Sequence, residues 1–146
     1  MLGSERPPAA LAQHSGYLMN WLAQRSRSRF QAALEQATGL HPREFGALSV
    51  IASEEGVTQQ AAGEAAGIDP STMVATLDGL EARGLAERRP HPGDRRKRAV
   101  HLTAKGRRAL EAGQEVARQA GRETLGALDE GEREELNRLL RKLAGI

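Results

Sequence analysis

The segment between residues 69 and 106 constrains the fold more than any other part of the chain, because a capped helix is followed there by an arginine-rich pair of short strands. Asp69 is placed to cap the helix, and Pro70 occupies its first position, where a backbone N–H is not needed. Gly84 and Leu85 match a left-handed helix stop with its hydrophobic contact. A capped helix followed by a basic two-stranded loop is typical of a winged helix that binds DNA.

Charge is distributed unevenly along the chain. Residues 82–108 contain ten cationic and two acidic side chains, a net charge of +8 in a chain whose total is +2, so the other residues together carry −6. A charge run alone is most often a solvated hairpin. Because this run directly follows a helix-turn-helix pattern, it instead indicates a surface that contacts the DNA phosphate backbone.

The hydrophobic periodicity and the capping residues predict a mainly helical chain with one small β-hairpin. Met73, Thr76, Leu77 and Leu80 have the i, i+3, i+4, i+7 spacing of a helix that faces a core, and residues 67–69 form the short turn before it. The expected helices span residues 9–37, 42–54, 59–66, 70–83, 104–125 and 130–144. The expected strands span residues 85–89 and 97–102, with a turn over residues 90–94.

This order of elements predicts a fold class that is mainly α with a small β-hairpin wing: a winged helix-turn-helix with a helical dimerisation region. We expect one compact chain. Residues 1–38 would form an N-terminal arm and dimerisation helix, residues 39–103 the DNA-binding domain, and residues 104–146 the C-terminal dimerisation helices. Alternate residues of the segment 99–102 should point inward from the second strand.

Composition excludes several classes of site. The chain has no cysteine, so disulfides and cysteine-ligated metals are excluded, and its four histidines lie far apart without metal-ligand spacing. Phosphate-binding glycine loops and a nucleophile elbow are missing. We therefore expect no catalytic residues, no cofactor and no metal. No apolar run reaches the roughly 20 residues of a membrane span, and no secretory signal is recognisable, so we expect a cytoplasmic protein without a membrane partner.

Several segments together resemble one family. The chain resembles the MarR (multiple antibiotic resistance regulator) family of bacterial transcription factors over roughly residues 39–106. The most specific match is the Asp-x-Arg wing followed by Leu-Thr, whereas the glycine stops and caps alone are weak signals. The carrying segments are Gly39 to Leu48, Thr58-Gln59-Gln60, Asp69-Pro70-Ser71-Thr72, Leu80 to Leu85, Gly93-Asp94-Arg95-Arg96 and Leu102 to Gly106.

The resemblance implies a homodimer built by the first, fifth and sixth helices. It also implies two winged helices that read a pseudo-palindromic operator in double-stranded DNA, and commonly a small-molecule effector that relieves repression. The chain departs from the family pattern at His41, where threonine or serine usually caps the second helix. It also has Ala75 and Gly79 where many relatives carry arginine. We therefore expect the recognition helix to read bases more weakly and the wing to contribute more of the DNA affinity.

The candidate DNA-contacting residues lie at two helix starts, on the recognition helix and in the wing. Ser71 and Thr72 sit where the helix dipole favours phosphate, although local capping by these residues is an alternative. Arg96 is expected to enter the minor groove, with Asp94 supporting its aim. The full set of candidate contacts is Thr58, Gln59, Pro70, Ser71, Thr72, Val74, Ala75, Arg95, Arg96 and Lys97.

The flanking helices carry the candidate dimer and effector residues. The apolar stripe of the last helix needs a partner face, and the first helix adds further leucines. Tyr17 and Trp21 are one helical turn apart, and either line an effector pocket or pack in the dimer core. The candidate dimer residues are Leu11, Leu18, Leu136, Leu139, Leu140 and Leu143.

Two other function classes were weighed. One is the dimerisation portion of a methyltransferase-like enzyme, which would need an α/β cofactor domain that residues 1–146 do not contain. The other is a winged helix used only for protein–protein interaction, which has no need of a +8 arm beside a capped recognition helix. The favoured interpretation is a dimeric, sequence-specific DNA-binding regulator, a repressor relieved by an effector, and not an enzyme.

Overall fold

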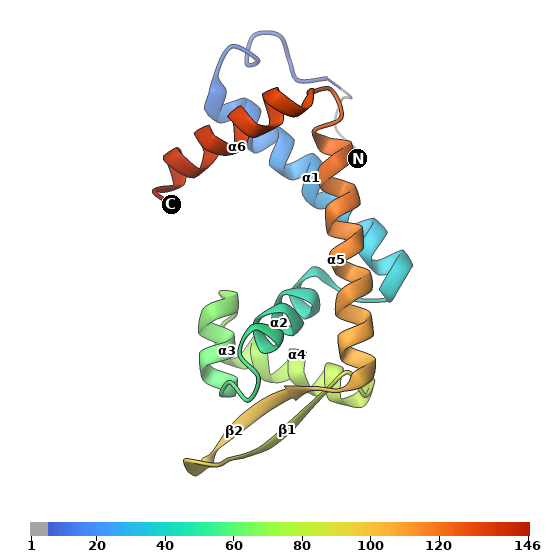
Figure 1. The fold of residues 1–146 in the computed structure, drawn as a ribbon, viewed down its shortest axis with the longest axis vertical. Coiled ribbons are helices and arrows are strands. Elements are labelled where there is room, and N and C mark those ends of the chain that lie inside the picture. Colours follow the sequence, from blue (N-terminus) through green and yellow to red (C-terminus); the bar gives the residue numbers. More distant parts are fainter. Residues whose placement is uncertain (1–5) are drawn as a thin grey trace. The chain divides into compact units, whose positions relative to one another are not determined.

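The computed structural model of the chain describes residues 6–146. Within them the order of elements is the expected one, with six helices and one antiparallel hairpin (Figure 1). The elements are α1 (Ser15–Thr38), α2 (Pro42–Ser53), α3 (Gln59–Ala66), α4 (Pro70–Ala82), β1 (Ala86–His91), β2 (Asp94–Leu102), α5 (Ala104–Thr124) and α6 (Glu130–Ala144). The predicted fold class is confirmed.

The chain divides into two compact units, to both of which α1 and α5 contribute. One unit comprises residues 31–117 and contains α2, α3, α4 and the hairpin. The other comprises the described residues up to 30 together with residues 118–146. No helix in the described part of the chain is long and apolar enough to cross a membrane.

The core of the 31–117 unit is built from aliphatic side chains of every helix in it. Leu34, Leu48, Ile51 and Leu77 are fully buried, and Val100 of β2 closes the core from the hairpin side. The predicted inward face of α4 is confirmed, because each of its four periodic residues is buried. The helices α2, α3 and α4 pack around this core, and the hairpin projects beyond them (Figure 1).

The turn between α3 and α4 is as short as the glycine pattern predicted. Gly67 ends α3 in the left-handed conformation, with φ of 66°. The Ile68 N–H then donates to the Gly63 carbonyl over 2.8 Å, and Asp69 caps α4. A Cβ on Gly63 would lie 3.1 Å from the Ile68 carbonyl oxygen, so a side chain there would require the turn to shift by a few tenths of an ångström.

The hairpin is longer than the sequence predicted. Its strands reach His91 and start again at Asp94, and Pro90 pairs with Arg98, so the predicted five-residue turn shrinks to residues 92–93. Proline is tolerated because it lies beside an irregularity between Pro90 and His91, where one ladder hydrogen bond is not required. The imidazole Nδ1 of His91 accepts from the Gly93 N–H over 3.0 Å and closes the turn.

The expected alternation along residues 99–102 is wrong at its start. Ala99 and Val100 are consecutive and both buried. The reason is a third extended segment: Thr58 forms a bridge with Ala99, and the Val100 N–H donates to the Val57 carbonyl over 2.9 Å. The segment before α3 therefore pairs with the edge of β2 that β1 leaves open.

The first helix starts later than predicted, at Ser15 and not at residue 9. The N–H groups of Leu11 and Ala12 both donate to the Pro8 carbonyl, which closes a separate turn. The His14 N–H then donates to the Leu11 carbonyl at the junction with the helix. The apolar and alanine residues of this stretch are compatible with either structure, so their pattern did not reveal the interruption.

The unit of terminal segments has almost no core within one chain. Ala120 is its single buried apolar residue among those described, and α6 has no buried residue at all. The predicted capping box of α6 is confirmed: the Asp129 carboxylate accepts from the Glu132 N–H and the Glu132 carboxylate accepts from the Asp129 N–H, each over 2.9 Å. The helix therefore forms from local signals while its apolar stripe stays exposed.

Candidate nucleic-acid interface

The outer face of α4 presents short side chains. Ser71, Val74 and Ala75 are exposed. The four periodic residues of α4 described above are on the opposite side of the helix and face the core. Thr72 is half-buried and Pro70 is exposed at the first turn. A recognition helix with small side chains can approach base edges closely but offers few hydrogen bonds, so apolar contact with thymine methyl groups is available to Val74 and Ala75.

The start of α4 is occupied by its own cap. The Thr72 hydroxyl, the Ser71 hydroxyl and the Thr72 N–H hold the pKa of the Asp69 carboxyl well below its usual range. The Ser71 Oγ donates to Asp69 Oδ1 over 2.7 Å. Asp69 is therefore the cap and Ser71 and Thr72 donate to it, so a phosphate at this helix end would meet a carboxylate.

The start of α3 lies against the wing. The Thr58 hydroxyl caps α3 by accepting from the Ala61 N–H over 3.2 Å. The side-chain oxygen of Gln59 accepts from Arg88 Nη1 over 3.2 Å, so its amide NH₂ is the group left for DNA. Arg88 also pairs with Asp78 and Glu81 of α4, and thereby ties β1 to both helices of the motif.

Several of the ten basic residues counted in residues 82–108 are engaged inside the fold. Arg83 pairs with Glu44 over 3.0 Å, Arg89 with Glu87, and Arg107 with Glu55 over 2.9 Å. Lys105 Nζ donates to the Arg83 carbonyl over 2.8 Å. These contacts hold the wing and α5 in place, so the net charge of the segment overstates the charge offered to DNA.

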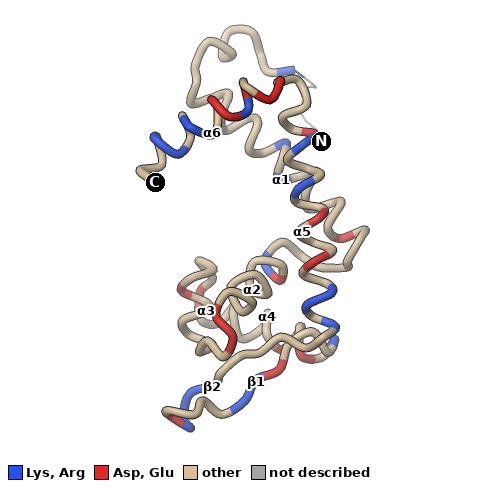
Figure 2. The backbone as a smooth tube through the Cα atoms, in the orientation of Figure 1, with Lys and Arg blue, Asp and Glu red and all other residues tan. Residues whose placement is uncertain are grey.

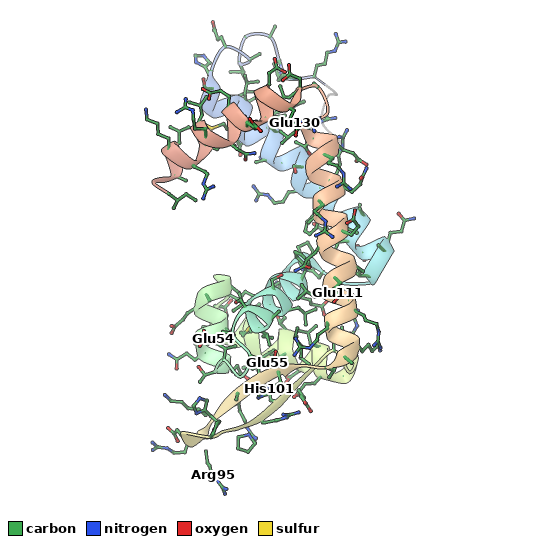
Figure 3. All side chains as sticks on the ribbon, in the orientation of Figure 1. Glu54, Glu55, Arg95, His101, Glu111 and Glu130 are labelled. Carbon is green, nitrogen blue, oxygen red and sulfur yellow. The ribbon has the colours of Figure 1, made fainter. Side chains whose placement is uncertain are left out.

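Three cations of β2 differ from these. Arg95, Lys97 and Arg98 of β2 are exposed, and none has an ion-pair partner among residues 6–146. Basic residues gather near the tip of the hairpin (Figure 2). Arg95 extends away from the tip (Figure 3). Free cations at the end of a projecting hairpin suit contact with phosphates or with a minor groove.

The predicted support of Arg96 by Asp94 is present. Asp94 Oδ1 accepts from the Arg96 N–H over 3.1 Å and from Arg96 Nε over 3.2 Å. The Arg96 hydrogen bonds hold the pKa of the Asp94 carboxyl below its usual range. The Arg96 side chain is 91% exposed and the Asp94 side chain is 29% exposed, so the arginine projects while the carboxylate stays at the strand.

The base of the wing is anchored by a cluster that the sequence analysis did not identify. Glu55 Oε1 accepts from the Leu102 N–H over 3.2 Å and lies 3.4 Å from His101 Nδ1, while Glu55 Oε2 accepts from Arg107. Figure 3 shows Glu55 and His101 side by side. No local signal marks Glu55, because its partners lie 47 and 52 residues later in the chain.

Comparison with known proteins matches this arrangement. Residues 38–97 match the model of the MarR family. The chain is 32% identical to the HTH-type transcriptional repressor NicR of Pseudomonas putida, over 95% of this chain and 87% of NicR. This chain belongs to the MarR family. It is a DNA-binding transcriptional regulator.

Two solved structures of MarR-type regulators are similar along most of the chain. The repressor CouR of Rhodococcus jostii, bound to a 23-mer DNA duplex, has 29% identity and a TM-score of 0.79, covering 97% of this chain and 99% of CouR. BpsR of Bordetella bronchiseptica, whose DNA binding is regulated by 6-hydroxynicotinic acid, has 30% identity and a TM-score of 0.73. That match covers 88% of this chain and 97% of BpsR.

The structure shows what replaces the usual MarR-family residues at two positions of this chain, His41 and Gly79. His41 caps α2 through its imidazole: Nδ1 accepts from the Arg43 N–H over 3.2 Å, while the Glu44 carboxylate accepts from the His41 N–H over 2.9 Å. A Cβ on Gly79 would meet Glu44 Oε1 at 3.7 Å, an ordinary contact distance. Histidine therefore replaces the usual hydroxyl cap, and nothing in the structure requires glycine at position 79.

The candidate effector residues lie on α1 of this MarR-family regulator. Tyr17 and Trp21 are both half-buried, and the Arg25 guanidinium carbon lies 4.7 Å from the centre of the Trp21 ring. Neighbouring Ser26 is within 3.4 Å of the Thr124 hydroxyl, which joins α1 to α5. Aromatic rings beside a guanidinium are suited to a planar anionic ligand.

The candidate dimer residues divide by exposure. Leu18 and Leu136 are half-buried within one chain. The other four are exposed, and additional exposed apolar residues accompany them. The exposed set in this unit is Leu11, Met19, Leu22, Leu139, Leu140, Leu143 and Ile146. So much apolar surface on so few elements is typical of a subunit interface.

Proposed function

We propose that this chain is a homodimeric repressor that binds a pseudo-palindromic operator through two winged helices and releases it when a small aromatic acid binds. The DNA-binding domain of residues 39–103 would carry the contacts. The flanking segments 1–38 and 104–146 would form the dimer. The observation that carries the proposal is the row of exposed basic side chains on β2, three of which have no ion-pair partner among residues 6–146, next to a recognition helix whose outer face is free of bulky groups.

Repression is supported by the relatives, because NicR is a transcriptional repressor and CouR is a repressor bound to DNA. Dimerisation is supported by the near absence of a core in the terminal segments. Two winged helices related by a two-fold axis would meet half-sites about one helical turn apart on one face of the duplex. A cytoplasmic location follows from the proposed operator binding.

The chemical class of effector is supported by the neighbours. BpsR responds to 6-hydroxynicotinic acid, and CouR has been solved with p-coumaroyl-CoA, so both bind an aromatic ring with a carboxyl-derived group. In this chain Tyr17 and Trp21 would contact the ring and Arg25 the acid group. The alternative role of Tyr17 and Trp21 is packing in the dimer core, which agrees equally well with their half-buried side chains.

The DNA-binding part is tested with a duplex selected from a random pool by the full-length protein. Binding measured by fluorescence anisotropy should weaken steeply with salt. The slope of log K against log salt should be roughly −0.9 for each phosphate neutralised. An isolated half-site should bind much more weakly than the full site. A flat salt response, or selection of no common sequence, would instead indicate a winged helix that binds protein.

The effector part has its own readout, because Trp21 is the only tryptophan of the chain. A panel of aromatic acids that includes 6-hydroxynicotinate should contain one that changes Trp21 fluorescence saturably and weakens operator binding by about 5- to 150-fold. Tyr17→Ala should abolish that response while operator binding without ligand stays intact. Unchanged fluorescence and affinity across the panel would overturn effector control and leave the DNA-binding proposal standing.

A further inference from the structure

Asp78 lies on the outer face of the recognition helix. It follows Val74 by four residues and Ala75 by three, and residues at these spacings share one face of a helix. Its side chain is 58% exposed, whereas the neighbouring Leu77 is fully buried. A carboxylate therefore stands in line with the small residues that would enter the major groove.

The Asp78 carboxylate is tethered through one of its oxygens. Its Oδ1 accepts from Arg88 Nη2, and Arg88 is fixed in turn by Glu81 and by the Gln59 amide oxygen. Both oxygens of Glu81 are occupied, one by the Arg88 N–H over 2.6 Å and one by its guanidinium. Asp78 Oδ2 has no hydrogen-bond partner among residues 6–146, so it is the acceptor that the cluster leaves open.

An open carboxylate oxygen discriminates between hydrogen-bond donors and acceptors on base edges. In the major groove cytosine presents its N4 amino group as a donor, and thymine presents its O4 acceptor in the same place. A carboxylate accepts from the first and is repelled by the second. Adenine also offers an N6 donor, but its N7 acceptor lies beside that donor, whereas cytosine presents its N4 donor alone. The carboxylate is also repelled by phosphates, so it weakens binding to every duplex that offers no donor at that position.

We propose that Asp78 is a specificity-determining residue that accepts a hydrogen bond from the N4 amino group of one cytosine in each half-site, and that Arg88 is the positioning residue that aims it. The proposal rests on the proposed insertion of α4 into the major groove. It accounts for an anionic side chain on the outer face of a DNA-reading helix, because the guanidinium of Arg88 offsets part of its repulsion from the backbone.

The test is a change of base preference with an isosteric variant. In Asp78→Asn the side-chain oxygen can still accept from Arg88, and the amide NH₂ then takes the place of the open acceptor. Full-length wild type and Asp78→Asn are compared on the selected operator, with each C·G pair changed in turn to T·A in both half-sites. At one position wild type should prefer C·G by about tenfold or more, and the variant should prefer T·A.

Glu81→Gln is the matched control. It removes the other carboxylate of the same cluster, whose two oxygens both bind Arg88, and it should lower the melting temperature without altering preference at any base pair. Asp78→Asn should also bind a non-cognate duplex more tightly than wild type, because a repulsive charge is removed. A purely structural role for Asp78 would leave the preference at every base pair unchanged.

Three results would overturn the proposal. If Asp78→Asn keeps the wild-type preference at every position, Asp78 serves only to hold Arg88. If Glu81→Gln shifts the preference from C·G to T·A as Asp78→Asn does, the preference depends on the shape of the wing and not on Asp78. If wild type selects no sequence and binds duplexes without salt dependence, the proposed function fails first, and the cytosine contact fails with it.

Discussion

At the scale of the residue, Arg96 is the side chain most clearly placed to reach DNA. It is almost fully exposed, it is tethered at Nε and at its own N–H by Asp94, and it lies among free cations. An arginine in a narrow minor groove reads the enhanced negative potential there. Its guanidinium makes no contact with the core, so the fold does not depend on it.

We expect Arg96→Ala to lose about 1–3 kcal/mol of operator-binding free energy per site with no change in melting temperature. Asp94→Ala should lose less, because it loosens the aim of Arg96 without removing a contact. Anisotropy titrations and thermal melts measure the two effects. Wild-type affinity for Arg96→Ala, beside severe loss for Ala75→Glu on α4, would show that the wing is only a solvated hairpin.

Two glycines of the winged helix differ in what a methyl group would meet. A Cβ on Gly106 would lie 1.9 Å from the Leu85 carbonyl oxygen, where α5 starts against the end of α4. Thr103 fixes that approach: its Oγ1 donates to the Gly84 carbonyl and accepts from the Gly106 N–H. A Cβ on Gly79 would instead make only an ordinary contact, 3.7 Å from Glu44 Oε1.

Gly106→Ala should therefore lower the free energy of unfolding by about 3 kcal/mol or more, since backbone must move to relieve the overlap. Gly79→Ala should raise it by about 0.5–1 kcal/mol, the usual advantage of alanine inside a helix. Urea unfolding of both variants gives the comparison. Equal stability of the two would contradict the close approach at residue 106.

At the scale of the element, α4 depends on the charged form of its cap. The pKa of Asp69 is lower in the folded chain than in the unfolded chain, because hydroxyl and N–H groups bind its carboxylate. A lowered pKa means that the stabilisation is complete above the unfolded-state pKa of about 4 and is lost as pH falls below it. The cap therefore weakens in acid.

Asp69→Ala should be less stable than wild type at neutral pH, because the Thr72 N–H loses its acceptor. The stability difference should stay constant from about pH 7 to pH 5 and shrink below about pH 4. Unfolding titrations at several pH values measure it. A difference that grows on acidification would reverse the sign and refute the assignment of the carboxylate as the cap.

At the scale of the whole molecule, the terminal segments need a second chain. Leu143 is 74% exposed and Leu140 is 43% exposed on a helix that buries nothing within the monomer. Covering this stripe with the same stripe of a partner would supply the missing core. The apolar surface of α6 is then a structural requirement of the dimer.

Wild type should sediment at twice the mass of one chain at micromolar concentration. Leu140→Glu should raise the dimer dissociation constant by at least about 100-fold, because an unpaired carboxylate in an apolar interface costs on the order of several kcal/mol. Val74→Glu is the matched control: Val74 is 39% exposed on α4, and its change should leave the mass unaltered. A dimer that tolerates Leu140→Glu would place the interface elsewhere.

The sequence by itself determined the local structure of this protein. Asp69 with Pro70, Gly67, and Asp129 with Glu132 act over at most four residues, so their capping geometry is encoded in the chain order. The order of helices and hairpin follows from such signals. The resemblance to the MarR family was recognised from motifs of the same local kind. Errors arose where local pattern is ambiguous, at the start of α1 and at the length of the wing turn.

Only the tertiary structure decided which arginines are free. Arg83 is bound by Glu44, 39 residues away, and Arg88 by Gln59, 29 residues away. Residue type and spacing cannot distinguish them from Arg95 or Arg98, because an ion pair depends on which distant elements meet in space. Long-range pairing likewise joined Ala99 to Thr58, and the contact of β1 with α4 left Asp78 with one open oxygen.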